Sequence, residues 1–551
     1  MSETNKNRIK QSFILGSLTS SAGVFLSKII GLFYVVPFTA LATEKNMVFY
    51  SGPYSYYSIL LQICSAGLPF ATAAVVAKYA NADNWKTVLL TRKLSLGVLA
   101  ASGFLMGVLF IATSGPLALR TLGANATPSD IQKMRIAFMI LALALFLVPV
   151  LSSYRGFYQG LKDLKVYADT QVFEQFGRVF FLLFLGWLFV KVFHFDSIYA
   201  VYMAVLATSL GAGIAILYYI HYDRRHIGPI LREARNQEAE VVDSKQILKE
   251  LFVFGLPYLL SAVIGNSQIL INTRFFIPVT TSLGMNYDNA KLLYGIIQVQ
   301  VDKLTSIPQV LGIGFSAGIV PYMTVALENE NFSMLRKNIQ ECLETVLFIA
   351  LPICFAMFAL ARPIYYIMYG NAHLNYGEIC LQYASLLALV TTITPICSSM
   401  MMTLHLRKES LFYLFVGFVI KCATFYPLIR YIGYPGAIVS SVLCSLTIIY
   451  LDLAKLKNKF DVSYATTGKR LVKIVLACLA MNGGFALLNF VVKVNETNRM
   501  LALAQLALYG VVGIVLYFYI ANMLKLPKAI FHKSMKEIFN QYNPFKRHDK
   551  N

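Results

Sequence analysis

The hydrophobic positions of this chain fall into long runs that are separated by short polar links. Each run has the length that a helix needs to cross the hydrocarbon core of a bilayer, about 20 residues, and holds few charges. This pattern predicts an all-α membrane protein with about 14 transmembrane helices. The predicted spans are residues 11–41, 54–79, 88–114, 132–158, 166–190, 197–221, 250–277, 292–326, 341–367, 379–404, 410–430, 435–454, 470–492 and 500–523.

The basic residues gather in alternate links and at both ends of the chain, which has a formal net charge of +21. With an even number of spans, both termini lie on one side of the membrane. The links on that side, led by 222–249 and 455–469, hold most of the Lys and Arg residues. The positive-inside rule makes that side the cytoplasm, where the basic tail would either lie against anionic membrane lipids or be a solvated segment without a specific role. Because the charge forms no stripe on a folded domain, we expect no nucleic acid partner.

The sequence has no motif that would carry out a hydrolytic or metal-dependent reaction. It contains no GxxxxGK[ST] phosphate-binding loop and no HExxH zinc motif, and its eight cysteines include no CxxC pair. Such motifs hold nucleotide phosphates or a metal ion in place. We therefore expect that the protein is not an enzyme, and that it holds no cofactor.

Two segments recur along the chain at nearly the same offset. SAGLPFAT (65–72) resembles SAGIVPYMT (316–324), and PVLSSYRGFYQGLKD (149–163) resembles PICSSMMMTLHLRKE (395–409). Both offsets correspond to six predicted spans, so the two halves of the repeat have the same orientation in the membrane. The repeat predicts two parallel six-helix bundles with pseudo-twofold symmetry around a central cavity, followed by two extra C-terminal helices.

The domain organisation follows from this repeat and from the charged links. We expect two six-helix lobes, a charged cytoplasmic linker between them, two further helices and a basic cytoplasmic tail. The predicted boundaries are 1–222 for the N-terminal lobe, 223–249 for the linker, 250–455 for the C-terminal lobe, 456–525 for helices 13 and 14, and 526–551 for the tail.

Several charged residues lie inside the predicted spans, where they are costly. A basic side chain at a helix centre costs about 2.5–3.5 kcal/mol on insertion scales, so it is expected to face a water-filled cavity. Helical spacing puts Lys28 on one face with Ser21, and Arg178 on one face with Gln171, so both would belong to polar stripes. The candidate binding residues are Lys28, Glu174, Arg178, Arg274, Asp302, Lys303 and Lys421.

Other placements remain open for most of these residues. Glu174 and Arg178 are four positions apart and would neutralise one another on a single helix. Asp302 and Lys303 would each form a pair across helices. Arg274 and Lys421 lie near predicted span ends, where snorkelling to the interface is the alternative.

A cavity in which positive charge predominates favours an anionic ligand. Phosphates suit such a cavity because lysine binds them as a point charge and arginine as a planar fork. Lys28 has no acid nearby in the sequence and lies deep in its span, which favours a position in the cavity wall.

Five segments of the sequence resemble signatures of one transporter family. They are SKIIG (27–31), SAGLPFATAAVVAKY (65–79), YRGFYQGLKD (154–163), QVFEQFGR (171–178) and VDKL (301–304). In order and in span number they are similar to the MurJ and stage V sporulation protein B-like polysaccharide transporters. That family belongs to the multidrug/oligosaccharidyl-lipid/polysaccharide exporter superfamily.

The resemblance implies a flippase of the bacterial cell membrane with both termini in the cytoplasm. It would move an undecaprenyl-diphosphate-linked sugar precursor, lipid II for peptidoglycan synthesis, to the outer leaflet by alternating access. Lys28 and Lys303 would replace arginines that hold the diphosphate, and helices 13 and 14 would form a groove for the lipid tail. The implied partners are the lipid-linked anionic oligosaccharide, membrane lipids and the cell-wall synthesis machinery.

The sequence also departs from the family pattern. A second basic residue expected after the first motif is replaced by Phe33 and Tyr34, and an acidic residue expected in span 7 is replaced by Asn272 or Thr273. Coupling to sodium or to the membrane potential therefore stays open. Other substrates are a teichoic acid or capsule precursor, and other functions are a cation-coupled multidrug exporter and a scaffold for envelope synthesis that transports nothing.

Overall fold

The structure, a computed structural model, describes residues 34–65, 68–161, 163–237 and 240–531. Helices joined by short links make up nearly all of this part of the chain, and it contains no β-strand. Contacts between Cα atoms divide the chain into two compact units, Met1–Lys303 and Leu304–Asn551. The all-α fold class predicted from the apolar runs is confirmed.

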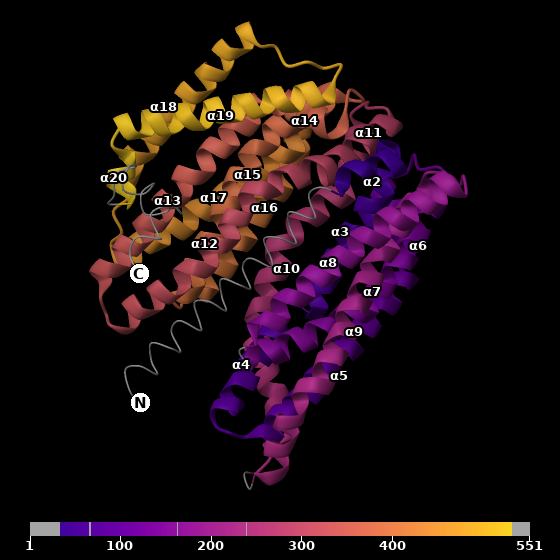
Figure 1. The fold of residues 1–551 in the computed structure, drawn as a ribbon, viewed down its shortest axis with the longest axis vertical. Helices are drawn as coiled ribbons and strands as arrows, with labels where there is room; N and C mark the ends of the chain where they lie inside the picture. Colours follow the sequence, from indigo (N-terminus) through magenta and orange to yellow (C-terminus); the bar gives the residue numbers. More distant parts are fainter. Residues whose placement is uncertain (1–33, 66–67, 162, 238–239, 532–551) are drawn as a thin grey trace, which may run out of the picture. The chain divides into compact units, whose positions relative to one another are not determined.

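The first unit is a bundle in which α7 packs against α3, α4, α5 and α9, while α8 lies along α9 (Figure 1). A 3₁₀ turn over Glu44–Asn46 precedes α3, and π-helical turns over Leu188–Val192 and Ile296–Val301 continue α8 and α11. Its helices are α2 (Val35–Ala42), α3 (Met47–Ser65), α4 (Leu68–Asn81), α5 (Trp85–Ala112), α6 (Ser114–Leu122), α7 (Pro128–Gly160), α8 (Leu164–Trp187), α9 (Ile198–Asn236), α10 (Ser244–Ser282) and α11 (Tyr287–Gly295).

The glycines of the YRGFYQG segment allow α7 to approach the backbone of α4. A Cβ atom added at Gly156 would lie 2.6 Å from the carbonyl oxygen of Pro69, and one added at Gly160 would lie 2.7 Å from that of Ala73. Any larger residue at either position would push the two helices apart. These two glycines, one helical turn apart, therefore set the distance between α7 and α4.

The second unit contains two apolar cores. One joins α12, α13, α15 and α17 around Met323, Cys397 and Leu456, and the other joins α13 to α18, α19 and α20 around Phe348, Cys478 and Tyr517. Figure 1 shows α18 and α19 lying side by side, as their contacts require. The helices are α12 (Asp302–Glu328), α13 (Phe332–Ala359), α14 (Ala361–Tyr369), α15 (Leu374–Thr403), α16 (Arg407–Ile432), α17 (Gly436–Phe460), α18 (Ala465–Val491), α19 (Arg499–Met523) and α20 (Leu526–Phe531).

The predicted repeat is visible in the local structure of both units. In each unit an asparagine side chain accepts a hydrogen bond at the start of a 28-residue helix, Asn84 before α5 and Asn331 before α13. A nine-residue helix follows, α6 or α14, and ends at a glycine with positive φ, Gly123 at 87° or Gly370 at 86°. A backbone in this left-handed region favours glycine, so both copies use the same stop signal.

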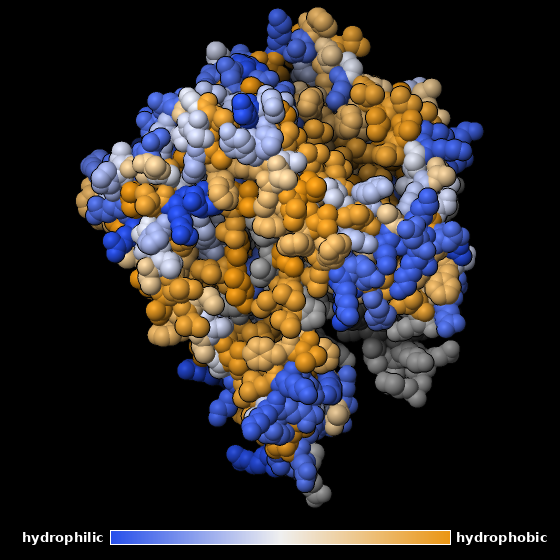
Figure 2. All heavy atoms as spheres, turned by 180° about the vertical axis from the view of Figure 1, so that it is seen from behind, coloured by the Kyte–Doolittle hydropathy of each residue, from blue (hydrophilic) through white to orange (hydrophobic). Residues whose placement is uncertain are grey.

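Ten helices among the described residues are long and apolar enough to cross a membrane. They are α5, α7, α8 with its π-helical turn, α9, α13, α15, α16, α17, α18 and α19. Figure 2 shows wide hydrophobic areas over one face, with hydrophilic residues gathered in separate clusters. The predicted spans 54–79, 250–277 and 292–326 are not among the ten, and most of the predicted span 11–41 lies outside the described residues, so the count of fourteen is not confirmed.

One predicted span has the wrong boundaries. The apolar run 341–367 was predicted as a single helix, but α13 ends at Ala359 and α14 begins at Ala361. The separating residue, Leu360, has φ −103° and ψ 21°. Arg362 and Pro363 follow directly after the break, so a charge and a proline mark it although the surrounding residues are apolar.

The unit boundary differs from the predicted lobe boundary. Contacts place α10 with the first unit, where it packs against α3, α4 and α6. The predicted C-terminal lobe begins at residue 250, within α10. The division into lobes at residues 222 and 250 stays a prediction.

Candidate functional site

Arg178 on α8 lies among three tyrosines of the first unit. One of its terminal nitrogens, Nη2, lies 3.2 Å from the hydroxyl oxygen of Tyr50 and 3.5 Å from that of Tyr34. The guanidinium carbon stands 5.4 Å from the ring centroid of Tyr54, a distance at which a cation is attracted to the ring face. The Nε atom is buried and has no hydrogen-bond partner among the described residues.

Tyr34 stands where the family pattern leads one to expect a second basic residue. Its hydroxyl is hydrogen-bonded to Arg178 and lies 3.4 Å from the hydroxyl of Tyr50. The positive charge next to Tyr34 is therefore supplied by Arg178 on α8. The helical spacing of Gln171 and Arg178 had marked Arg178 as a candidate, but not its tyrosine partners.

Glu174 is paired with Arg155 on α7, and not with Arg178 one turn along its own helix. The distance from Nη2 of Arg155 to Oε2 of Glu174 is 2.5 Å. The alternative in which Arg178 neutralises Glu174 is thus not the pairing in the structure, because α7 supplies a second arginine as the partner. Sequence reasoning missed Arg155 as part of the site, although it is the arginine of the YRGFYQG segment.

Lys303 and Asp302 follow directly after the π-helical turn Ile296–Val301. Lys303 is half-buried and interacts electrostatically with the hydroxyl of Tyr50, as Arg178 does, while Asp302 is exposed. Gln300 is fully buried in the turn, and its side-chain amide donates to Oε1 of Glu44 at 3.1 Å. Turns of this type often occur at functional sites because they change the direction of the following side chains. The charges of Arg178 and Lys303 thus both act on one tyrosine hydroxyl, to which Arg178 is hydrogen-bonded.

Arg274 has a different environment, near the end of α10. Its Nη1 donates to the backbone carbonyl of Arg120 at 2.9 Å, in the last turn of α6, and its guanidinium lies 5.1 Å from the Phe275 ring. The last carbonyls of a helix lack partners within that helix, and a cation near them is favoured. This contact agrees with the alternative that Arg274 lies near a span end.

Lys421 is buried within the second unit. Its ammonium is hydrogen-bonded to three neutral oxygens of α17 and has no solvent exposure. Both predicted placements, in a cavity wall or snorkelling to the interface, are therefore corrected. Lys28 lies outside the described residues, so its predicted position stays a prediction.

An apolar cavity of about 380 Å³ lies in the second unit between α13, α14, α18 and α19. Its wall is almost entirely hydrocarbon and aromatic ring. Gly510 and Gly513 line the cavity on the α19 side, where they have no side chain to fill it. A Cβ atom at Gly513 would lie 2.6 Å from the Phe485 ring. Lining residues include Phe348, Pro352, Met481, Phe485, Gly510 and Tyr517. The cavity suits a hydrocarbon chain and offers nothing to a charged group.

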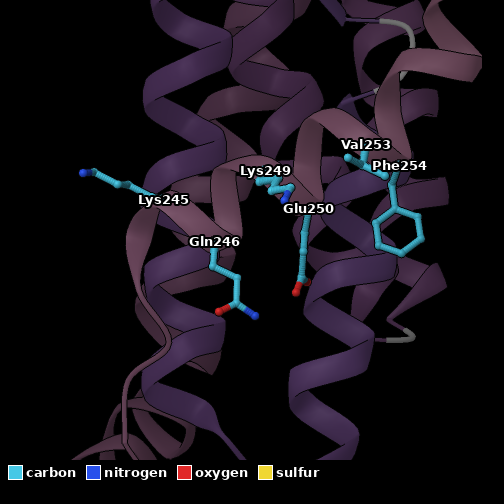
Figure 3. A pocket seen from close by; sticks show the side chains of 6 residues that line it. All are labelled: Lys245, Gln246, Lys249, Glu250, Val253 and Phe254. Atoms are coloured by element: carbon cyan, nitrogen blue, oxygen red, sulfur yellow. The ribbon is translucent and has the colours of Figure 1, made fainter.

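A second cavity, of about 550 Å³, lies in the first unit beside the first turns of α10. Figure 3 shows Gln246 and Glu250 pointing to one side, whereas Lys245 extends away from them. Glu250 is held by the ammonium of Lys78 at 2.7 Å and the hydroxyl of Tyr79 at 3.1 Å. Its charges diverge or are already paired, so this cavity is not a convergent anion site.

The described residues provide neither a nucleophilic serine motif in its usual setting nor a cluster of metal ligands. Residues 314–318, GFSAG, fit the GxSxG pattern, but they lie inside α12, whereas a nucleophilic serine of that motif needs a sharp turn from strand to helix. Ser316 is hydrogen-bonded to Ser399 and to the carbonyl of Pro395. Among the described residues, no three His, Cys, Asp or Glu side chains are grouped to hold a metal ion.

The fold and the site define a multi-pass membrane protein with a cationic cluster in one unit and an apolar cavity in the other. The chain belongs to the polysaccharide biosynthesis protein family, which residues 14–326 match. Residues 301–426 also match the MatE family. The predicted resemblance to polysaccharide transporters is confirmed, and the chain is a protein of the cytoplasmic membrane.

Relatives and solved structures agree with this assignment. The chain is 24% identical to the lipid II flippase MurJ of Bacillus subtilis (strain 168) over 540 residues, 97% of this chain and 99% of the relative. It is 20% identical to stage V sporulation protein B of the same organism over 370 residues, 66% of this chain and 68% of the relative.

The fold is shared with solved membrane transporters. The structure of the lipid II flippase MurJ in an inward closed conformation covers 93% of this chain, and the chain covers 98% of it, with a TM-score of 0.66 and 13% identity. An inward-facing multidrug resistance MATE family transporter covers 78% of this chain, and the chain covers 98% of it, with a TM-score of 0.60 and 16% identity.

Proposed function

We propose that this chain is a flippase that moves lipid II, an undecaprenyl-diphosphate-linked sugar precursor, from the inner to the outer leaflet by alternating access. The observation that carries the proposal is the end-to-end similarity to a lipid II flippase, which covers 97% of this chain and 99% of the relative. Flipping moves a molecule without making or breaking a covalent bond. It therefore fits a chain whose described part offers charged and apolar surfaces but no metal cluster.

The headgroup would be held by positive charge. Arg178 has one buried nitrogen that no described residue accepts from, and its charge and that of Lys303 both act on the hydroxyl of Tyr50. A diphosphate offers oxygens to both, and hydrogen bonds between ionised partners are the strong ones. Lys28 is the third proposed ligand. Glu174 is less suited to counter these cations, because Arg155 already neutralises it.

The lipid tail would occupy the apolar cavity of the second unit. Burial of a polyprenyl chain is favourable by about 25 cal/mol of free energy for each Å² of apolar surface that leaves water. Moving the chain from lipid to an apolar groove changes its free energy little, because neither environment is water. The cavity between α13, α14, α18 and α19 would therefore guide the tail and contribute little binding energy. Its volume of about 380 Å³ would take a segment of the tail, and the rest would stay in the bilayer.

The membrane potential would help to drive the movement. An inside-negative potential pushes anions outward by about 2.3 kcal/mol per charge for each 100 mV. A diphosphate with two charges would gain about 4–5 kcal/mol in this way. With both termini in the cytoplasm, the basic links lie on the side from which the anion departs. Coupling to sodium is the alternative source of energy.

A second candidate function is a cation-coupled multidrug exporter. The match of residues 301–426 to the MatE family and the likeness to MATE transporters favour it. A cavity for cationic drugs would expose acidic groups, but Glu174 is neutralised by Arg155 and the cluster around Tyr50 is cationic. The flippase therefore fits the charges better.

Depletion in the native host tests the proposal. The gene is placed under a repressible promoter, and lipid-linked precursors are extracted and identified by mass spectrometry as the protein is lost. Lipid II is expected to accumulate on the inner leaflet, before other lipid-linked sugars do. Accumulation of a teichoic acid or capsule precursor instead would reassign the substrate. Unchanged precursors together with increased sensitivity to cationic drugs would favour the exporter.

A further inference from the structure

Lys421 on α16 places its ammonium in a closed cage of oxygens on α17. The Nζ atom lies 2.9 Å from the carbonyl oxygen of Ala437, 2.8 Å from the hydroxyl of Ser440 and 2.6 Å from that of Ser441. The side chain has no solvent exposure. An ammonium has three protons, and this cage offers each of them one acceptor.

The two serine hydroxyls of the cage each make a second hydrogen bond, within α17. The hydroxyls of Ser440 and Ser441 both donate to the carbonyl of Ala437, at 2.8 and 3.3 Å. Because their hydrogens point to that carbonyl, their lone pairs are free to face Nζ.

No carboxylate of the described residues compensates the charge. The described residues contain no acidic group within ion-pair distance of Lys421. The remaining attraction comes from the ring of Phe425, whose centroid lies 5.1 Å from Nζ. A buried charge without an opposite charge is stable only if dipoles replace its water shell completely. The three oxygens and the ring supply that replacement.

The helices close tightly over the cage. One turn before Lys421, a Cβ atom added at Gly417 would lie 2.6 Å from the Ile448 side chain and 3.1 Å from the carbonyl oxygen of Cys444. The glycine lets α16 and α17 approach closely and so keeps water away from the ammonium.

We propose that the oxygens of Ala437, Ser440 and Ser441 form a monovalent-cation site, which the chain fills with its own tethered ammonium. Lys421 thereby fastens α16 to α17 without a dissociable ion. The second unit then keeps this contact in the absence of sodium or potassium. The inference does not depend on the proposed transport activity.

Cation rescue of a truncated side chain tests this site. Full-length wild type and Lys421→Ala are purified in detergent, and their thermal unfolding is measured in chloride salts of sodium, potassium, ethylammonium and tetramethylammonium at equal ionic strength. We expect Lys421→Ala to unfold about 5 °C or more below wild type. Ethylammonium or an alkali ion should recover at least half of that shift, while bulky tetramethylammonium should not. Wild type should respond alike to all four salts.

Two results would overturn the proposal. One is a Lys421→Ala protein that gains no more from the small cations than from tetramethylammonium. The other is a Lys421→Met protein as stable as wild type, because packing alone would then explain the contact.

A double-mutant cycle keeps the test decisive if Lys421→Ala does not fold. Lys421→Met and the double substitution Ser440→Ala with Ser441→Ala are compared singly and together. The serine substitutions should lower the unfolding temperature of wild type but leave that of Lys421→Met nearly unchanged, since they remove acceptors that only the ammonium uses. Equal shifts in both backgrounds would show that the serines and the lysine act independently, which contradicts a shared cation site.

Discussion

Glu174 is bound by Arg155 across the contact between α7 and α8, at 2.5 Å, although Arg178 stands one turn away on its own helix. This pairing leaves Arg178 to the hydroxyls of Tyr34 and Tyr50. One arginine thus neutralises the acid, and the other keeps its positive charge among tyrosine hydroxyls. The two arginines therefore have different roles, which substitutions can separate.

Loss of Arg155 is expected to destabilise the fold. Arg155→Ala leaves the half-buried carboxylate of Glu174 without its partner, which costs about 1–3 kcal/mol. Arg155→Ala with Glu174→Gln should recover much of this loss, because no unpaired charge then remains. Thermal unfolding of the purified single and double variants measures both effects. A double variant that is less stable than Arg155→Ala would show that the pair is not the source of the effect.

Loss of Arg178 is expected to impair transport more than stability. Arg178→Ala removes a positive charge that faces tyrosine hydroxyls and not a carboxylate. Growth of a depleted host, with the protein level checked by immunoblot, should show a strong defect for Arg178→Ala and a milder one for Arg178→Lys, which keeps the charge but loses the fork. Tyr34→Phe is the matched control that removes one hydrogen bond and retains the cation. A full rescue by Arg178→Ala would remove this residue from the proposed site.

Transport is expected to require a positive charge at positions 28 and 303, but not the particular shape of a lysine side chain. Both lysines stand where the resemblance implies an arginine, so Lys28→Arg and Lys303→Arg should support growth of the depleted host. Lys28→Ala and Lys303→Ala should abolish it at normal protein level. Wild-type flipping by either alanine variant would refute the assignment of that lysine to the diphosphate.

Filling the apolar cavity is expected to slow transport without unfolding the protein. Gly510 lines the cavity, and a Cβ atom there meets nothing within 4 Å, so Gly510→Leu places a side chain in open space. Gly483 on α18 also has open space but does not line the cavity, and Gly483→Leu is the matched control. Lipid II translocation in vesicles should fall for the first variant and not for the second. Equal rates would place the lipid tail elsewhere.

The link before α19 is expected to loosen in acid. Arg362 on α14 donates to both carboxylate oxygens of Glu496, at 2.6 and 3.0 Å, and holds the pKa of Glu496 below its ordinary value of 4.5. The stabilisation is complete above that ordinary value and is lost as pH falls through the lowered pKa. The protection factor of the backbone amides of residues 492–498, which is the intrinsic exchange rate divided by the observed one, should therefore fall below about pH 4.

Glu496→Gln provides the control for this pH dependence. The variant lacks the ionised partner. The protection factors of its amides in this link should therefore be low already at neutral pH and should change little in acid. If the protection factors of wild type and variant differed by the same ratio at pH 3 and pH 7, the ion pair would not be the pH-sensitive element.

Local patterns in the sequence were sufficient for much of the fold. Run length and hydropathy located ten spans that the structure contains, because a helix in lipid must satisfy its backbone within itself. The repeat was also visible locally, and it returns in the caps Asn84 and Asn331 and the glycines Gly123 and Gly370. The break at Leu360 was missed, because the length of the apolar run was followed past Arg362 and Pro363, which mark it.

The sequence by itself determined that this chain is a helical membrane protein of the polysaccharide-transporter type, since hydropathy, charge bias and motifs are properties of short segments. Only the tertiary structure decided the partner of each buried charge. Arg155 reaches Glu174, and Lys421 reaches the serines of α17, because helices cross at particular rotations and distances. A periodic pattern identifies the polar face of one helix, but it does not identify the helix that this face meets.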